Sequence, residues 1–163
     1  MGLLDAFFKN DDAQNKEEVK EEVRILTKDL IKLNLDPIDK EEAIRLAGEL
    51  LVNNGYVEEE YISGMLAREE KVSTYMGNGV AIPHGTKDAK KYIKETGISL
   101  LQFPEGIDFG AGETCRLLIG IAGQGEDHMQ ILQNLATVCQ DEETTEELMT
   151  TNNKELIIRQ LVK

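Results

Sequence analysis

The chain contains two histidines, and both occupy unusual positions. His84 lies between Pro83 and Gly85, in a glycine-rich loop rather than within a periodic apolar segment. Proline restricts the backbone before the imidazole and glycine leaves space after it, so the loop could present this ring to a docking partner. Imidazole is a nucleophile that is largely neutral near pH 7. From spacing alone, a functional histidine and an ordinary loop histidine remain equally open.

His128 combines an apolar setting with the start of a helix. It falls in the first turn of a predicted helix, after the loop 120–125 that follows a continuous apolar strand. Free N–H groups and the helix dipole attract anions there, and α/β proteins bind ligands at such loops. The loop glycines are not in the GxGxxG order of dinucleotide sites, so the pattern favours a small, phosphate-sized anion. The competing interpretation is a partly buried histidine at the edge of the core.

Arg68 is a third candidate, near the end of a predicted helix over residues 58–69 that turns Tyr61 inward. A guanidinium in that place could pair with an oxyanion, and the alternative is a cation that interacts with the helix dipole. The two histidines and scattered carboxylates lack the ligand spacing of a zinc site. His84, His128 and Arg68 are therefore the candidates for a catalytic set, and neither a metal nor a cofactor is expected.

The elements that must position these residues follow from the hydrophobic pattern. Apolar residues recur at helical spacing in segments that predict helices at 39–54, 58–69 and 126–139. A last helix is predicted from the capping pair Asn152 and Glu155. Continuous apolar segments predict strands at 80–82, 97–103 and 116–122. Helices and strands alternate, so the sequence predicts an α/β fold with a sheet between helices.

The sequence also predicts a hairpin turn and the end of a strand. Asn78-Gly79 is typical of the turn of a β-hairpin. Residues 104–106, Pro-Glu-Gly, are expected to end the strand that precedes them.

The composition excludes several classes of function. The net charge is −13 on 163 residues, with a pI near 4.6. This balance disfavours nucleic-acid binding, which needs clustered Lys and Arg, and disfavours an anionic membrane surface. Apolar segments are too short to span a bilayer. Two cysteines give no disulfide framework, so a reducing, cytoplasmic location is expected.

The first 22 residues differ from the rest of the chain. We expect an acidic tail there, or a short docking helix that uses Leu3, Leu4, Phe7 and Phe8. The folded domain is predicted over residues 23–163.

The segment 77–86, GNGVAIPHGT, resembles the active-site signature of the type-2 EIIA domains. These domains belong to the bacterial phosphoenolpyruvate-dependent sugar phosphotransferase system. Segments 97–110 and 116–135 resemble the mannitol-specific branch, and the similarity runs from about Ile25 to the C-terminus. The resemblance implies a single domain of the mannitol/fructose EIIA type, with a mixed sheet flanked by helices.

The resemblance also implies roles for the candidate residues. His84 would be phosphorylated on Nε2, while His128 and Arg68 would stabilise the phosphoryl group in transfer. The donor would be phospho-HPr, and the acceptor would be the cysteine of the EIIB domain of a mannitol permease. The alternative is a nitrogen-type or fructose-type EIIA that works as a phosphorylation-dependent regulatory binding module. Neither nucleic acid nor direct membrane insertion is expected.

Overall fold

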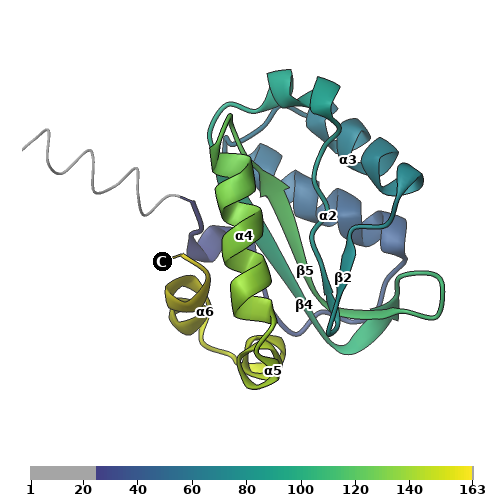
Figure 1. Cartoon of the computed structure of the whole chain (residues 1–163), viewed down its shortest axis with the longest axis vertical. Coiled ribbons are helices and arrows are strands. Elements are labelled where there is room, and N and C mark those ends of the chain that lie inside the picture. Colours follow the sequence, from purple (N-terminus) through teal and green to yellow (C-terminus); the bar gives the residue numbers. More distant parts are fainter. Residues whose placement is uncertain (1–24, 163) are drawn as a thin grey trace, which may run out of the picture.

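The computed structural model describes residues 25–162, which form a mixed β-sheet covered by helices (Figure 1). The sheet has five strands in the order β1-β4-β5-β3-β2. In chain order they are β1 (Ile31–Lys32), β2 (Tyr75–Gly77), β3 (Val80–Ala81), β4 (Gly97–Asp108) and β5 (Thr114–Ala122). The pairs β4–β5 and β2–β3 are antiparallel, whereas β1–β4 and β3–β5 are parallel. The predicted α/β class with a mixed sheet is confirmed.

The helices lie on both faces of this sheet (Figure 1). They are α2 (Lys40–Asn53), α3 (Glu60–Lys71), α4 (Asp127–Cys139), α5 (Glu142–Thr150) and α6 (Lys154–Leu161), with the 3₁₀ helices η1 (Lys28–Leu30) and η2 (Lys87–Tyr92). Two buried polar side chains of β4 mark the two faces. Ser99 Oγ donates to a carbonyl of α2 at 2.8 Å, whereas Gln102 Nε2 donates to a carbonyl of α5 at 3.0 Å. Because side chains alternate along a strand, these two residues point in opposite directions.

β5 is buried on both faces, as its continuous apolar sequence predicts. Every residue from Leu117 to Ala122 is buried, and the strand pairs with β4 on one side and β3 on the other. Its last residues lead into α4, so this strand sets where His128 lies.

The prediction that Pro104 and its neighbours end a strand is wrong. β4 continues to Asp108, with a shift in its register between Gln102 and Ile107. A bulge tolerates proline because it needs no ladder N–H at that point. The carbonyl of Pro104 instead accepts a bond from Arg116 Nε at 3.0 Å.

The helix ends differ from the predicted ones by small amounts. α2 begins after Asp39 and ends before Gly55, whose φ of 83° favours glycine, as expected. α3 begins and ends slightly later than predicted. The cap of the last helix is Asn153 rather than Asn152, because Asn153 accepts from two backbone N–H groups of the first turn. Asn152 instead accepts a bond from Asn34 at 2.7 Å.

The predicted hairpin turn is confirmed between β2 and β3. Asn78 and Gly79 have φ values of 52° and 78°, the two positive angles of a type I′ turn. The hydroxyl of Tyr75 accepts a bond from Gly79 N–H at 2.9 Å and braces the turn.

Candidate functional site

Three segments bring the two histidines and Arg68 to one part of the molecule. His84 follows β3 and forms an isolated parallel bridge with Ile121, near the end of β5. His128 lies in the first turn of α4, and its ring centroid is 5.0 Å from that of His84, at an interplanar angle of 60°. Arg68 lies in the last turn of α3, close enough for its charge to affect the pKa of His84. Residues that are far apart in sequence therefore share one site.

The backbone holds His84 in one orientation. Its Nδ1 lies 2.8 Å from the carbonyl oxygen of Ile82, and Pro83 O accepts a bond from Ile121 N–H at 2.9 Å. A carbonyl can only accept, so Nδ1 carries the proton and Nε2 of the neutral ring keeps its lone pair. Burial is the largest effect on the pKa of His84 and lowers it, the bond to Ile82 opposes this shift, and the Arg68 charge adds to it. Near pH 7 the ring is therefore neutral.

His128 is fixed mainly by the packing of the loop beneath it. A Cβ on Gly123 would lie 2.6 Å from His128 Cα, so the loop can approach the helix this closely only with glycine. Thr96 Oγ1 accepts from Gln124 N–H at 3.1 Å and donates to the carboxylate of Asp127 at 2.7 Å, which ties the loop to the start of β4.

The charge state of His128 follows from its surroundings. Burial first, then the positive charges that His84 and Lys90 can carry, lower the pKa of His128 to about 4. The imidazole is neutral at pH 7 and can donate one hydrogen bond.

Arg68 projects from the end of α3. Its Nη1 donates to the carbonyl of Val72 at 2.6 Å, in the segment that follows the helix. This contact lies just beyond the end of α3, where the alternative interpretation places a cation, but it joins the extended residue after the helix. A guanidinium has five N–H donors, so the same side chain can also bind an oxyanion.

Sequence reasoning missed Glu69, the buried neighbour of Arg68. Its carboxylate accepts from Thr74 N–H at 2.9 Å and from Thr74 Oγ1, and lies 3.1 Å from Lys40 Nζ. Burial would raise the pKa of Glu69, but the bonds from Thr74, with contributions from Ser73 and Lys40, outweigh it and hold the pKa below its usual range. The carboxylate therefore anchors the segment between Arg68 and the hairpin. A charged residue in a predicted helix gives no sequence signal for this burial.

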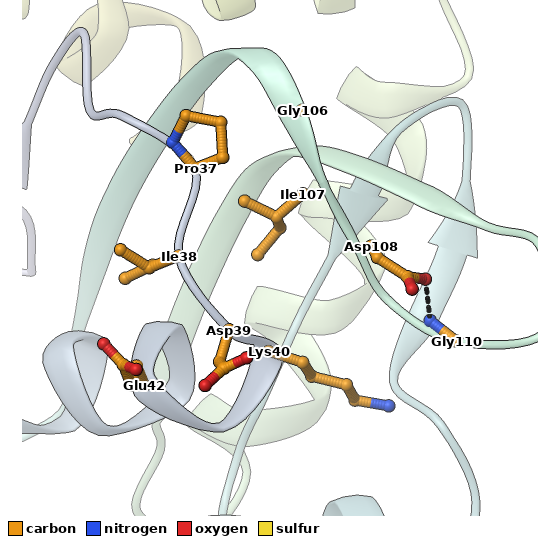
Figure 2. Close-up of a pocket in the computed structure, with 9 residues that line it drawn as sticks. All are labelled: Pro37, Ile38, Asp39, Lys40, Glu42, Gly106, Ile107, Asp108 and Gly110. Atoms are coloured by element: carbon orange, nitrogen blue, oxygen red, sulfur yellow. Dashed lines mark hydrogen bonds between the residues drawn. The ribbon is translucent and has the colours of Figure 1, made fainter.

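A separate hollow lies where α2 begins, between the chain before the helix and the bulged part of β4 (Figure 2). Its lining includes Lys40, Asp108 and Gly110, but neither histidine nor Arg68. The Lys40 side chain points away from Glu42 on the same helix (Figure 2) and reaches Glu69. This hollow is therefore not part of the histidine site, although Lys40 at its edge supports the segment next to Arg68.

The two cysteines lie away from this chemistry. Cys115 and Cys139 are buried free thiols, and burial raises their pKa values to about 12 and about 11. Cys139 is one of the buried residues of α4 and packs in the core. In residues 25–162, no helix has both the length and the apolar content needed to cross a bilayer.

The chain matches the family model for the phosphoenolpyruvate-dependent sugar phosphotransferase system, EIIA 2, over residues 24–163. It belongs to this family. The resemblance carried by the GNGVAIPHGT segment is thus confirmed, and this EIIA domain is a phosphotransferase component of that system.

Relatives and solved structures extend this result. The mannitol-specific phosphotransferase enzyme IIA components of Bacillus subtilis (strain 168) and Geobacillus stearothermophilus are 48% and 52% identical to the chain. These alignments cover 83% and 82% of this chain, and 95% and 92% of the two relatives. The Escherichia coli complex of enzyme IIA mannitol with phosphorylated enzyme IIB mannitol matches with a TM-score of 0.78 and 40% identity, over 83% of this chain and 96% of that one.

Proposed function

We propose that this EIIA domain is a cytoplasmic, mannitol-specific phosphocarrier. Its His84 accepts a phosphoryl group from phospho-HPr and passes it to the cysteine of an EIIB domain, for mannitol uptake and phosphorylation. The observation that carries the proposal is the bond between His84 Nδ1 and the carbonyl of Ile82, which leaves Nε2 as the nucleophile. The second histidine at 5.0 Å and Arg68 at the end of α3 supply donors around it.

The transfer can be written atom by atom. The lone pair of His84 Nε2 attacks the phosphorus of phospho-HPr and forms an N–P bond. The N–P bond of the donor histidine breaks, and its electron pair returns to the donor nitrogen. Nε2 carries no proton before the attack, so none has to leave it, and Nδ1–H keeps its bond to Ile82 O. In the second step a cysteine thiolate of EIIB attacks the phosphorus, and the electron pair of the N–P bond returns to Nε2.

The surrounding groups act on the phosphoryl group in flight. Phosphoryl transfer depends on positioning and on electrostatic stabilisation of the equatorial oxygens. We assign this role to the guanidinium of Arg68 and to a neutral His128 that donates one hydrogen bond. A neutral His128 fits its low pKa of about 4.

The named partners have support from the comparisons. The E. coli protein in the matching structure is bound to phosphorylated enzyme IIB, and the B. subtilis and G. stearothermophilus relatives are mannitol-specific. These relatives favour the transport branch over a nitrogen-type or fructose-type regulatory module. We place the catalytic domain over residues 23–163. The acidic tail or short docking helix expected in residues 1–22 lies outside the described residues.

The test is a reconstituted relay. The protein is incubated with phosphoenolpyruvate, the general phosphotransferase enzyme and HPr, and its intact mass is measured. We expect a gain of one phosphoryl group that is acid-labile and base-stable, as phosphohistidine is, and that is lost when a mannitol EIIB domain is added. No gain of mass would contradict the phosphocarrier function. A phosphoryl group that EIIB cannot remove would favour the regulatory alternative.

A further inference from the structure

Tyr61 joins the loop that carries His84 to the strand that leads to His128. The residue is 2% exposed and lies in the first turn of α3. Its hydroxyl donates to the carbonyl of Ile121 at 2.7 Å and accepts from the N–H of Gly85 at 2.9 Å. Burial raises the pKa of Tyr61 to about 12, so the hydroxyl keeps the proton that it donates. Both partners are backbone groups next to, or bridged with, His84.

The ring of Tyr61 also packs closely against the backbone of the loop at Gly85. A Cβ on Gly85 would lie 2.6 Å from Cε1 and 2.9 Å from Cζ of the Tyr61 ring. The same helix contacts the loop again one turn later, because Thr86 N–H donates to Gly64 O at 3.3 Å. There, a Cβ on Gly64 would lie 2.4 Å from the Ala89 methyl. α3 therefore supports the His84 loop along two successive turns.

We propose that Tyr61 is a positioning residue for phosphoryl transfer, whose hydroxyl fixes the His84 loop relative to β5 and α3. Arg68 lies on the same helix, about two turns further along. β5 leads through Gly123 into the first turn of α4, where His128 lies. One hydroxyl group thus connects the His84 loop, the helix that carries Arg68 and the strand that leads to His128. The inference rests on the proposed function of those residues.

A tyrosine that serves stability alone would have different consequences. Loss of a buried hydroxyl leaves two backbone groups without their partner and weakens the fold, whatever the function. A positioning role adds a loss of rate in molecules that remain folded, since small misplacements of reacting groups are costly in transfer reactions. The hydroxyl is buried and cannot touch HPr, so the loss should appear in kcat and leave KM for HPr unchanged.

The experiment compares Tyr61→Phe with a matched control, Tyr75→Phe. In both residues the hydroxyl accepts a glycine N–H at 2.9 Å, but Tyr75 braces the β2–β3 hairpin instead of the His84 loop. For Tyr61→Phe we expect kcat for transfer from phospho-HPr to fall by about 10- to 100-fold, at temperatures where the variant is folded. Tyr75→Phe should relay within about twofold of the wild type.

A second measurement does not depend on the relay. The ¹⁵N shifts of the His84 imidazole report whether Nδ1 or Nε2 carries the proton. The wild type should show the Nδ1–H form, and Tyr61→Phe should show a mixture of both forms. If Tyr61→Phe does not fold, Gly85→Ala provides the test. This variant keeps the hydroxyl but drives a methyl group into the ring, and it should give the same losses.

Each outcome decides a separate point. A folded Tyr61→Phe that relays at the wild-type rate and keeps the Nδ1–H form overturns the positioning role and leaves the proposed function intact. Equal losses in Tyr61→Phe and Tyr75→Phe also overturn it, because they indicate general destabilisation. A wild-type protein that accepts no phosphoryl group contradicts the proposed function itself. The imidazole shifts then still show whether Tyr61 orients His84.

Discussion

His84 and His128 face each other across 5.0 Å, yet the protein holds them by different means. The His84 ring is bonded to its own backbone at Ile82 O, in a loop that is hydrogen-bonded to β5. His128 depends on the close approach of its helix to Gly123, and among residues 25–162 its ring has no hydrogen-bond partner. The His84 imidazole therefore has a fixed tautomer, whereas either ring nitrogen of His128 can carry the proton and donate a hydrogen bond.

This difference fits two separate roles for the two imidazoles. A group that forms a covalent bond benefits from a fixed orientation, because its lone pair must lie in line with the phosphorus. A group that supports the phosphoryl only in transit benefits from a hydrogen bond that strengthens in the transition state. The ring bonded at Nδ1 suits the first role, and the ring with both nitrogens available suits the second. The following predictions test whether this distinction holds.

The largest effect is expected for His84→Ala. This variant should keep its fold and accept no phosphoryl group from phospho-HPr, because it lacks the proposed nucleophile. Intact-mass measurement after incubation with the complete donor system checks this, with a circular dichroism spectrum as the control for folding. Full phosphorylation of the variant would place the acceptor on another residue and remove the basis of the comparison.

Arg68→Lys should have the next largest effect. A lysine keeps the charge but not the planar fork of donors, and loss of one preorganised donor typically slows a reaction by ~100- to 1000-fold. The rate of transfer from phospho-HPr to EIIB, measured by rapid quench, should fall accordingly. Arg159→Lys, at an exposed position of α6, is the matched control and should relay normally. A wild-type rate for Arg68→Lys would leave Arg68 with its helix-end contact to Val72 alone.

His128→Ala should separate the two halves of the relay. His84 keeps its bond to Ile82, so we expect this variant still to be phosphorylated. Onward transfer to EIIB should slow by roughly 10- to 100-fold, because a donor to the phosphoryl group in flight is lost. Single-turnover measurements of each half-reaction test this. Equal slowing of both steps would contradict the proposed separation of roles, in which His84 accepts the phosphoryl group and His128 supports its transfer.

The smallest effect concerns stability and pH. The pKa of His128 is about 4 when folded, below the ordinary 6.5, so below pH 6.5 the unfolded chain binds a proton that the folded chain does not. Stability should therefore fall as the pH drops from about 6.5 towards 4. Because the ring is partly exposed, we expect the free energy of unfolding to fall by about 1 kcal/mol, which is less than the full pKa shift would give.

Urea unfolding at several pH values tests this effect, with His128→Gln for comparison. The variant should lose less stability over that range than the wild type. His84, whose pKa is also lowered, would still contribute a change of the same sign. Equal pH dependence in the two proteins would contradict the lowered pKa of His128.

Sequence patterns predicted the helices and long strands better than the features that depend on pairing between strands. The apolar period of residues 40–53 and the continuous apolar segment 117–122 determine their structures locally, because each buries a defined face. The extension of β4 past Pro104 was missed, since a bulge depends on the partner strand. The two-residue strand β1 was missed as well, because it exists only through its pairing with β4.

The site shows the same limit. The loop around His84 and the helix start at His128 could be identified from the types and order of nearby residues. Tyr61 was predicted only to face inward, and its bonds to Gly85 and Ile121 became visible once the segments were placed together. Glu69 is similar, because its burial depends on Thr74 and Lys40 in other elements. Such contacts join distant parts of the chain, so they produce no local pattern in the sequence that could predict them.

The two buried cysteines bear on the fidelity of the relay. In the proposed second step the phosphoryl group leaves His84 for a thiolate, and the carrier itself contains two thiols. Attack on phosphorus needs the thiolate, and pKa values near 12 and 11 keep Cys115 and Cys139 almost fully protonated at neutral pH. Both are also shielded within the core. The phosphoryl group therefore has no thiol within residues 25–162 to which it could be lost before it reaches the proposed acceptor.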